Sequence, residues 1–193
     1  MLKTKIAVFV SGGGTNFEAL INAQENGKIP HGEIVLMVSS SKTAYALKRA
    51  ENHGIKSVVC SKKELGSQES FEEEILKNLE ENDIQLIVLA GFMSILSKEF
   101  TKKYENRIIN IHPSLIPSFC GEGFYGLHVH EAALKKGVKV TGATVHIVNE
   151  IPDGGPIIMQ RAVYVEENDT PEILQKRVME QAEWKILPES VEL

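Results

Sequence analysis

The chain of 193 residues (21.4 kDa) carries 21 Lys and Arg against 26 Asp and Glu, which gives a formal net charge of −5. With 42% hydrophobic and 24% charged residues, it has the composition of a folded globular protein and not of a disordered chain. Its mild acidity and the lack of a long Lys/Arg cluster count against a nucleic-acid-binding protein.

The cellular setting follows from two further features. Cys60 and Cys120 are the only cysteines, too few for a disulfide framework, so a reducing compartment is favoured. No apolar run approaches the roughly 18 residues of a membrane span. The first apolar run, residues 6–10, is also too short for a signal peptide. We therefore expect a cytoplasmic protein.

In the first half of the chain, short Val- and Ile-rich runs alternate with helical patterns. The expected strands are residues 5–10, 33–38, 56–60 and 85–90, and the expected helices are residues 16–26, 43–53 and 68–82. Gly27 and Gly54 follow the first two helices, where left-handed caps are common. This order predicts an α/β fold of three layers, Rossmann-like, with a parallel sheet and right-handed crossovers.

The second half has a different pattern. A strand at 108–111 is followed by a Pro- and Gly-rich segment, 113–126, whose length indicates a functional loop. A helix at 128–136 precedes two strands, 139–149 and 156–166, which form a hairpin around the turn 151–155. A last helix begins near Thr170 and Pro171. No linker is evident, so residues 1–193 are expected to form a single domain.

A glycine-rich turn, Ser11-Gly-Gly-Gly-Thr-Asn16, joins the first expected strand to the first helix. Backbone N–H groups at such a helix start attract anions. Phe17 stands where the dinucleotide fingerprint needs a third glycine, and no Gly-Lys-Ser/Thr of a triphosphate loop follows. The turn therefore predicts a site for a single phosphate ester, and the alternative is a flexible, well-capped turn.

Asn110 and His112 occupy positions i and i+2 near the end of an expected strand, so their side chains point to the same side. Histidine can shuttle a proton near neutral pH, and an asparagine amide can donate to an oxyanion without titrating. The pair suits acyl transfer, with an ordinary satisfied histidine as the alternative.

Asp153 precedes Gly154 and Gly155 in the hairpin turn. It is either a turn-forming residue or a carboxylate that raises the pKa of His112, so that the imidazole can act as an acid. On the strand 139–149, alternation places Thr144 and His146 on one face, toward the same cleft.

Several motifs, taken together, resemble the phosphoribosylglycinamide formyltransferase family, folate-dependent enzymes of purine synthesis. The resemblance extends from the first strand to the last helix and is carried by residues 11–16, 90–96, 110–117, 142–146 and 153–158. It implies a formyltransferase fold with a parallel amino-terminal half and a mixed or antiparallel carboxy-terminal half of one sheet. It also implies transfer of the formyl group of 10-formyltetrahydrofolate to the amine of 5-phospho-ribosyl-glycinamide, with no metal.

The resemblance assigns roles to residues of this chain. Asn110 would hold the formyl oxygen of a tetrahedral intermediate, His112 would donate the proton, and Asp153 would raise the pKa of the histidine. The residues implied to bind the ribotide are Gly14, Thr15, Asn16 and Glu183. The residues implied to bind folate are Gln68, Met93, Ser94, Ile95, Leu96, Asn110, Asn149, Glu150, Ile151, Pro152 and Asp153.

The chain departs from the family pattern at three places. Gln68 stands where the family often has an arginine, the loop 118–125 is longer than in some relatives, and the last helix carries one extra residue near 179–183.

Other classes of function remain open from the residues alone. His112, His128, His130 and Asp153 could build a metal-dependent hydrolase, although His128 and His130 diverge on a helix and more commonly mark its capped, exposed start. Cys120 could act as an acyl nucleophile, and a packed thiol is the alternative. A nucleotide-binding module without catalysis is the third possibility.

Two rivals belong to the folate group. The deformylase sends the formyl group to water, and another formyltransferase acts on initiator methionyl-tRNA; each normally brings a further domain, for which 193 residues leave no room. The charge of −5 also disfavours tRNA. The expected partners are small-molecule substrates, and the expected state is a monomer or a homodimer.

Overall fold

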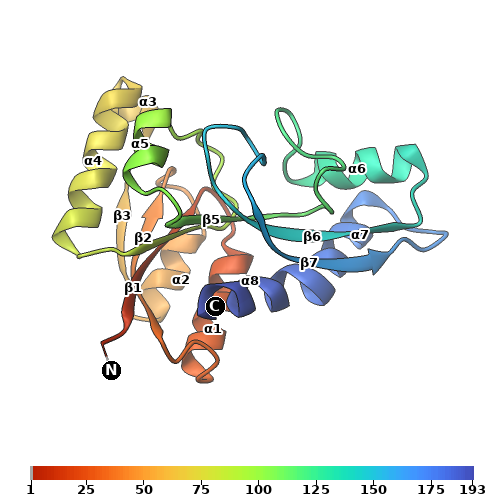
Figure 1. Cartoon of the computed structure of the whole chain (residues 1–193), viewed down its shortest axis with the longest axis horizontal. Coiled ribbons are helices and arrows are strands. Elements are labelled where there is room, and N and C mark those ends of the chain that lie inside the picture. Colours follow the sequence, from red (N-terminus) through yellow and green to blue (C-terminus); the bar gives the residue numbers. More distant parts are fainter. Residues whose placement is uncertain (1) are drawn as a thin grey trace.

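A single seven-stranded sheet runs through the computed structural model, which describes residues 2–193 (Figure 1). The strand order is β3-β2-β1-β4-β5-β6-β7. Strands β1 to β5 pair in parallel, whereas β6 runs antiparallel to β5 and β7 antiparallel to β6. The predicted change from a parallel to an antiparallel half is therefore confirmed. The strands are β1 (Thr4–Val10), β2 (Gly32–Ser39), β3 (Lys56–Val59), β4 (Leu86–Leu89), β5 (Ile108–His112), β6 (Val140–Ile147) and β7 (Ile157–Tyr164).

The longer helices lie where the sequence predicts them, within a few residues. The helices are α1 (Thr15–Glu25), α2 (Ala46–Asn52), α3 (Lys62–Leu65), α4 (Gln68–Glu81), α5 (Lys98–Lys103), α6 (Leu127–Lys136), α7 (Pro171–Val178) and α8 (Trp184–Glu192), with a π-helix, η1 (Met179–Glu183), before α8. Sequence periodicity does not predict α3 and α5, because so few residues cover hardly more than one turn. Gly27 and Gly54 have the positive φ angles expected of left-handed caps.

Each face of the sheet carries its own hydrophobic core. On one face, Val8 and Val10 of β1 pack with residues of α1, α7 and α8. On the other face, Phe9 packs with Phe71 and Phe100, which come from α4 and α5. This alternation of β1 side chains between two layers of helices is the physical basis of the predicted three-layer fold.

The extra residue of the last helix takes the form of the π-helix η1, between α7 and α8. A π-helix accommodates more residues per turn than an α-helix, because each N–H bonds to the carbonyl five residues back. Glu183 ends this turn with only 5% of its surface exposed. Its Oε2 accepts a hydrogen bond of 2.6 Å from Nδ2 of Asn16, and burial raises its pKa to about 7.

In the described part of the chain, no helix has the length and apolar character that crossing a membrane requires.

The buried carboxyl of Glu183 predicts a stability that falls as the pH rises. Its folded-state pKa, raised from 4.5 to about 7, makes the native state hold more protons than the unfolded chain between these values. Glu183→Gln should therefore raise the free energy of unfolding at pH 8 by about 3 kcal/mol. At pH 4, where the carboxyl is protonated in both states, the variant should gain little; urea unfolding at the two pH values measures the difference.

Glu180→Gln is the matched control, because Glu180 belongs to the same turn and is exposed. It should change the free energy of unfolding by little at either pH. A Glu183→Gln gain of equal size at pH 4 and pH 8 would contradict the assignment.

Candidate functional site

Asn110 and His112 meet Asp153 at the carboxyl end of β5. Oδ2 of Asp153 lies 3.4 Å from Nδ1 of His112, and Oδ1 lies 3.5 Å from Nδ2 of Asn110. Residues 110 and 112 share one side of the strand, so one carboxylate reaches both side chains. The structure thus brings together the three residues that sequence reasoning singles out for catalysis.

His146 of β6 completes this cluster. The registry of the antiparallel pair places it opposite Asn110, whose Nδ2 lies 3.1 Å from Nε2 of His146. Nε2 of His146 also lies 3.4 Å from Oδ1 of Asp153. The other ring nitrogen of His146, Nδ1, donates to the Ile147 carbonyl. The sequence placed His146 toward the cleft, but it gave no role to this contact.

Thr144, on the same face of β6, supports the segment that follows His112. Its hydroxyl donates to the Ser114 carbonyl at 2.7 Å and accepts from the Ile116 N–H at 3.1 Å. Thr144 therefore fixes the start of the loop 113–126 and does not itself line the cavity described below.

The turn after β6 delivers Asp153 to the site. Asp153 has a positive φ of 55°, a conformation that aspartate tolerates better than most residues. At Gly155 a Cβ atom would lie 1.8 Å from the Ile147 carbonyl oxygen, so only glycine lets the chain fold back this closely. Asp153 therefore both forms the turn and places a carboxylate beside His112.

The pKa of His112 is below its usual value, although the charge of Asp153 raises it as expected. Burial of the ring is the largest cause and outweighs the opposing effects of the Asp153 charge and of the hydrogen bond to Phe119. Nε2 of His112 donates to the Phe119 carbonyl at 2.9 Å, and Nδ1 faces the carboxylate. Both neighbours are acceptors, so the ring gains hydrogen bonds on protonation even though burial opposes the charge.

Asp153 is ionised at neutral pH. Burial alone would raise its pKa, but the hydrogen bond with His146, the charge of His112 and the Gly121 N–H together hold the pKa below its usual value. The Gly121 N–H donates to Oδ2 at 2.8 Å. The loop 113–126 therefore contacts the site twice, through Phe119 and through Gly121.

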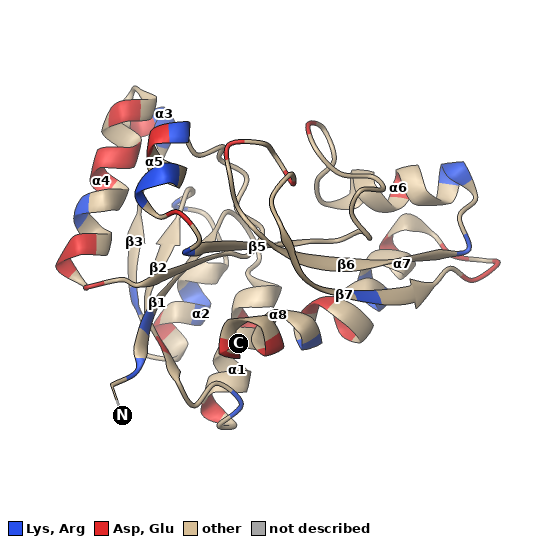
Figure 2. Ribbon diagram, in the orientation of Figure 1, with Lys and Arg blue, Asp and Glu red and all other residues tan. Residues whose placement is uncertain are grey.

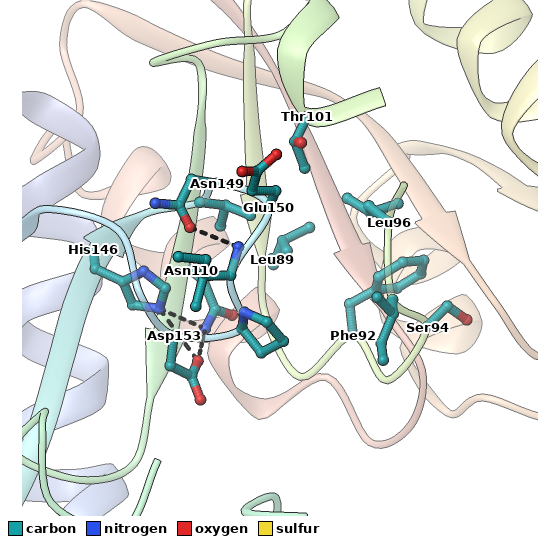
Figure 3. A pocket seen from close by; sticks show the side chains of 14 residues that line it. Leu89, Phe92, Ser94, Leu96, Thr101, Asn110, His146, Asn149, Glu150 and Asp153 are labelled. Atoms are coloured by element: carbon teal, nitrogen blue, oxygen red, sulfur yellow. Dashed lines mark hydrogen bonds and ion pairs between the residues drawn. The ribbon is translucent and has the colours of Figure 1, made fainter. Parts of the chain in front are cut away.

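A cavity of about 140 Å³ opens beside this cluster. In Figure 3, Asn110, His146 and Asp153 converge at one end of it, and Phe92, Ser94 and Leu96 lie on the opposite side. Its lining combines apolar side chains with an equal number of polar or charged ones, and such a mixture can bury a small molecule and fix its orientation. The lining residues are Leu89, Phe92, Ser94, Ile95, Leu96, Thr101, Asn110, His146, Val148, Asn149, Glu150, Ile151, Pro152 and Asp153.

Two residues implied to bind folate lie outside this lining. Met93 has a half-exposed side chain, and its N–H donates to Oγ of Ser11. Gln68 donates to the Ile95 carbonyl at 3.1 Å and to Glu72. It therefore contacts the backbone of a residue that lines the cavity without lining the cavity itself. Leu89 and Val148 also line the cavity, although neither the motifs nor the resemblance indicates them. Their positions near the ends of the expected strands 85–90 and 139–149 could have identified them, because ligands bind at strand ends.

The glycine turn forms a second part of the site at the start of α1. Gly14, with φ 71°, caps α1 without a side-chain hydrogen bond, which leaves first-turn N–H groups for a ligand. Nδ2 of Asn16 donates to Oε2 of Glu183 at 2.6 Å, so the glycine turn meets the end of η1. The Thr15 hydroxyl contacts the sulfur of Met179. Nε of Arg49 donates to the Gly13 carbonyl at 2.9 Å and holds the turn from α2.

The two parts of the site are joined through Ser11. Its N–H donates to the Gly91 carbonyl at 3.0 Å, and its hydroxyl accepts from the Met93 N–H at 2.8 Å. The segments after β1 and β4 therefore lie side by side at the carboxyl edge of the sheet. In an open α/β sheet this is where the strand order reverses and where ligands bind.

The histidines of α6 do not form a metal centre. His128 is exposed and pairs with Glu131, whereas His130 is fully buried, and no side chain caps the helix. The expectation that both residues mark a capped, exposed helix start is therefore wrong for His130. Across residues 2–193, no group of three or more His, Cys, Asp or Glu side chains has a geometry that could hold a metal ion.

Cys120 has the properties of a protonated thiol. Partial burial and the nearby charge of Asp153 raise its pKa, and its Sγ contacts the Pro117 carbonyl. A nucleophilic cysteine needs the opposite shift.

Charged residues of both signs are spread over the fold. Over the described residues, Lys and Arg are scattered on several helices and interleaved with Asp and Glu (Figure 2). A phosphate backbone requires a basic face or stripe.

Comparisons with known proteins agree with this geometry. The family model described as "Formyl transferase" matches residues 4–191. The chain is 47% identical over 191 residues to the trifunctional purine biosynthetic protein adenosine-3 of Gallus gallus, covering 99% of this chain but 18% of that protein. It is 38% identical to the phosphoribosylglycinamide formyltransferase of Haemophilus influenzae, covering 95% of this chain and 84% of the relative.

Solved structures share the whole fold. The glycinamide ribonucleotide transformylase 1 of Symbiobacterium toebii superposes with a TM-score of 0.92 at 37% identity, covering 99% of this chain and 87% of that one. The chain therefore belongs to the formyl transferase family.

Proposed function

We propose that the chain transfers the formyl group of 10-formyltetrahydrofolate to the amine of 5-phospho-ribosyl-glycinamide, in the cytoplasm and without a metal. The observation that carries this proposal is the cluster of Asn110, His112 and Asp153 beside a cavity, which Asn110 and Asp153 line and which His112 adjoins through its contact with Asp153. The names of full-length relatives, such as the enzyme of Haemophilus influenzae, support the same reaction.

The folate would occupy the cavity between the segment after β4 and the turn after β6. Ser94 to Leu96 and Asn149 to Asp153 line it from opposite sides, with Phe92 and Leu89 as apolar surface. A flat aromatic ring fits such a slot, and the polar backbone of the turn can bond its edge. The formyl group would then point toward Asn110.

The ribotide would bind at the start of α1. Its phosphate would accept hydrogen bonds from backbone N–H groups of Gly14, Thr15 and Asn16, favoured by the helix dipole. Glu183, bonded to Asn16, would hold the polar glycinamide end of the same substrate. The contacts of Ser11 place the two substrates next to each other.

The chemistry needs one bond to form and one to break. The substrate amine attacks the formyl carbon, and Asn110 Nδ2 donates to the developing oxyanion in exchange for its 3.5 Å contact with Asp153. The C–N bond to folate then breaks as a proton passes from the attacking amine to the leaving nitrogen by way of His112. Asp153 stabilises the imidazolium and fixes the orientation of the ring.

A donor-plus-acceptor assay tests the reaction. Purified protein is mixed with 10-formyltetrahydrofolate, with and without the ribotide, and tetrahydrofolate formation is followed. We expect turnover that depends on the ribotide. Equal turnover without it would identify a deformylase-type hydrolase and overturn the transferase assignment.

The geometry of the cluster predicts that its three side chains are each required for a high kcat. Asn110→Ala, His112→Ala and Asp153→Ala should each lower kcat by about 10²- to 10⁴-fold, because each removes oxyanion stabilisation or proton transfer. His128→Ala is the matched control, since His128 is exposed and contacts Glu131 and Tyr125 rather than the cluster, and so should keep the wild-type rate. Thermal unfolding checks that the variants are folded, and near-normal kcat in a folded variant would remove that residue from the mechanism.

A further inference from the structure

Glu72 of α4 is a buried carboxylate that lies behind the cavity and has no role so far. Only 8% of its surface is exposed. Oε1 accepts from the Ser97 N–H at 2.6 Å and from Nε2 of Gln68 at 2.5 Å, and Oε2 accepts from the Ser97 hydroxyl at 2.5 Å. One side chain thus joins α4 to the residue at which α5 begins.

Among the residues that the structure describes, no Lys, Arg or His lies within 4 Å of this carboxylate. Its oxygens are therefore bonded to N–H and O–H donors and not to a cationic side chain. A buried carboxylate without a cation is costly unless its oxygens accept enough hydrogen bonds. These three short hydrogen bonds therefore fix the relative positions of Gln68, Glu72 and Ser97.

The same contacts hold the cavity wall. Ser97 directly follows Ser94, Ile95 and Leu96, which line the cavity, and Gln68 also donates to the Ile95 carbonyl at 3.1 Å. Leu96 is anchored in the core beside Phe71 and Phe100, but the Ile95 side chain is 73% exposed, so at Ile95 the wall is held by hydrogen bonding rather than by packing. The other end of the segment is held by Ser11, through Gly91 and Met93.

We propose that Glu72 is a positioning residue for binding of the formyl donor: through Ser97 and Gln68 it holds residues 94–96 in the conformation that forms the folate pocket. This inference rests on the proposed function and adds to it a residue that does not touch the substrate. Without the carboxylate, residues 94–96 sample other conformations. The apparent affinity of the protein for the formyl donor is then reduced in proportion to the fraction of molecules in which the pocket is formed.

Steady-state kinetics with both substrates tests the role. Glu72→Ala leaves three donors without their acceptor, and we expect the KM for 10-formyltetrahydrofolate to rise at least about tenfold. The KM for the ribotide and kcat should stay within about threefold, because the glycine turn and the cluster at Asp153 are untouched. Glu72→Gln keeps an oxygen for the Ser97 N–H and should restore most of the affinity.

Glu73→Ala is the matched control, since Glu73 is the exposed neighbour on the same helix. It should leave both KM values unchanged. Gln68→Ala removes the bond to Ile95 at the edge of α4 and should raise the KM for the formyl donor about threefold, which keeps the proposal testable should Glu72→Ala not fold.

Calorimetric titration with tetrahydrofolate separates this inference from the proposed function. We expect the Kd of Glu72→Ala to rise with its KM. Wild-type protein that neither binds tetrahydrofolate nor transfers the formyl group would overturn the proposed function and this inference with it. Wild-type protein that does both, beside a folded Glu72→Ala with unchanged KM and Kd, would overturn the inference alone. An equal rise of both KM values with a lower Tm would also overturn it, in favour of a general structural role.

Discussion

The arrangement of the site depends on one partly buried carboxylate, that of Asp153. It contacts His112, Asn110 and His146 and accepts the Gly121 N–H, so β5, the loop after it, β6 and the turn that carries Asp153 meet at a single side chain. Burying a charge is unfavourable by itself, and these contacts offset that cost well enough to keep the carboxyl ionised. An ionised Asp153 in turn keeps an imidazolium accessible on a histidine that burial pushes toward neutrality.

The sheet makes this meeting possible. The parallel strands β1, β4 and β5 present their carboxyl ends at one edge, and the antiparallel β6 places His146 opposite Asn110. The registry of this antiparallel pair sets Asn110 opposite His146 and His112 opposite Thr144. The glycines of the turn after β6 then let Asp153 return to these residues.

Three residues outside the cavity lining hold parts of the site in position. Ser11 connects the glycine turn to the segment after β4, Thr144 fixes the start of the loop after His112, and Glu72 holds the wall of the cavity. None of these three side chains lines the cavity. Positions of this kind matter because reacting groups must be held within fractions of an ångström.

Sequence alone determined the order and type of the main elements, because hydrophobic periodicity and glycine or proline punctuation are local properties. It also determined the chemistry of the candidates, since Asn110 and His112 at a strand end and Asp153 before two glycines are readable as residue types in context. Tertiary structure alone decided the net pKa of His112, the burial of His130 and the partnership of His146, because burial and contact depend on residues distant in the chain. Glu72 shows the same limit: Gln68 is its neighbour one turn earlier on the same helix, but nothing in the sequence indicates the two donors of Ser97, which reach Glu72 only when α5 packs beside α4.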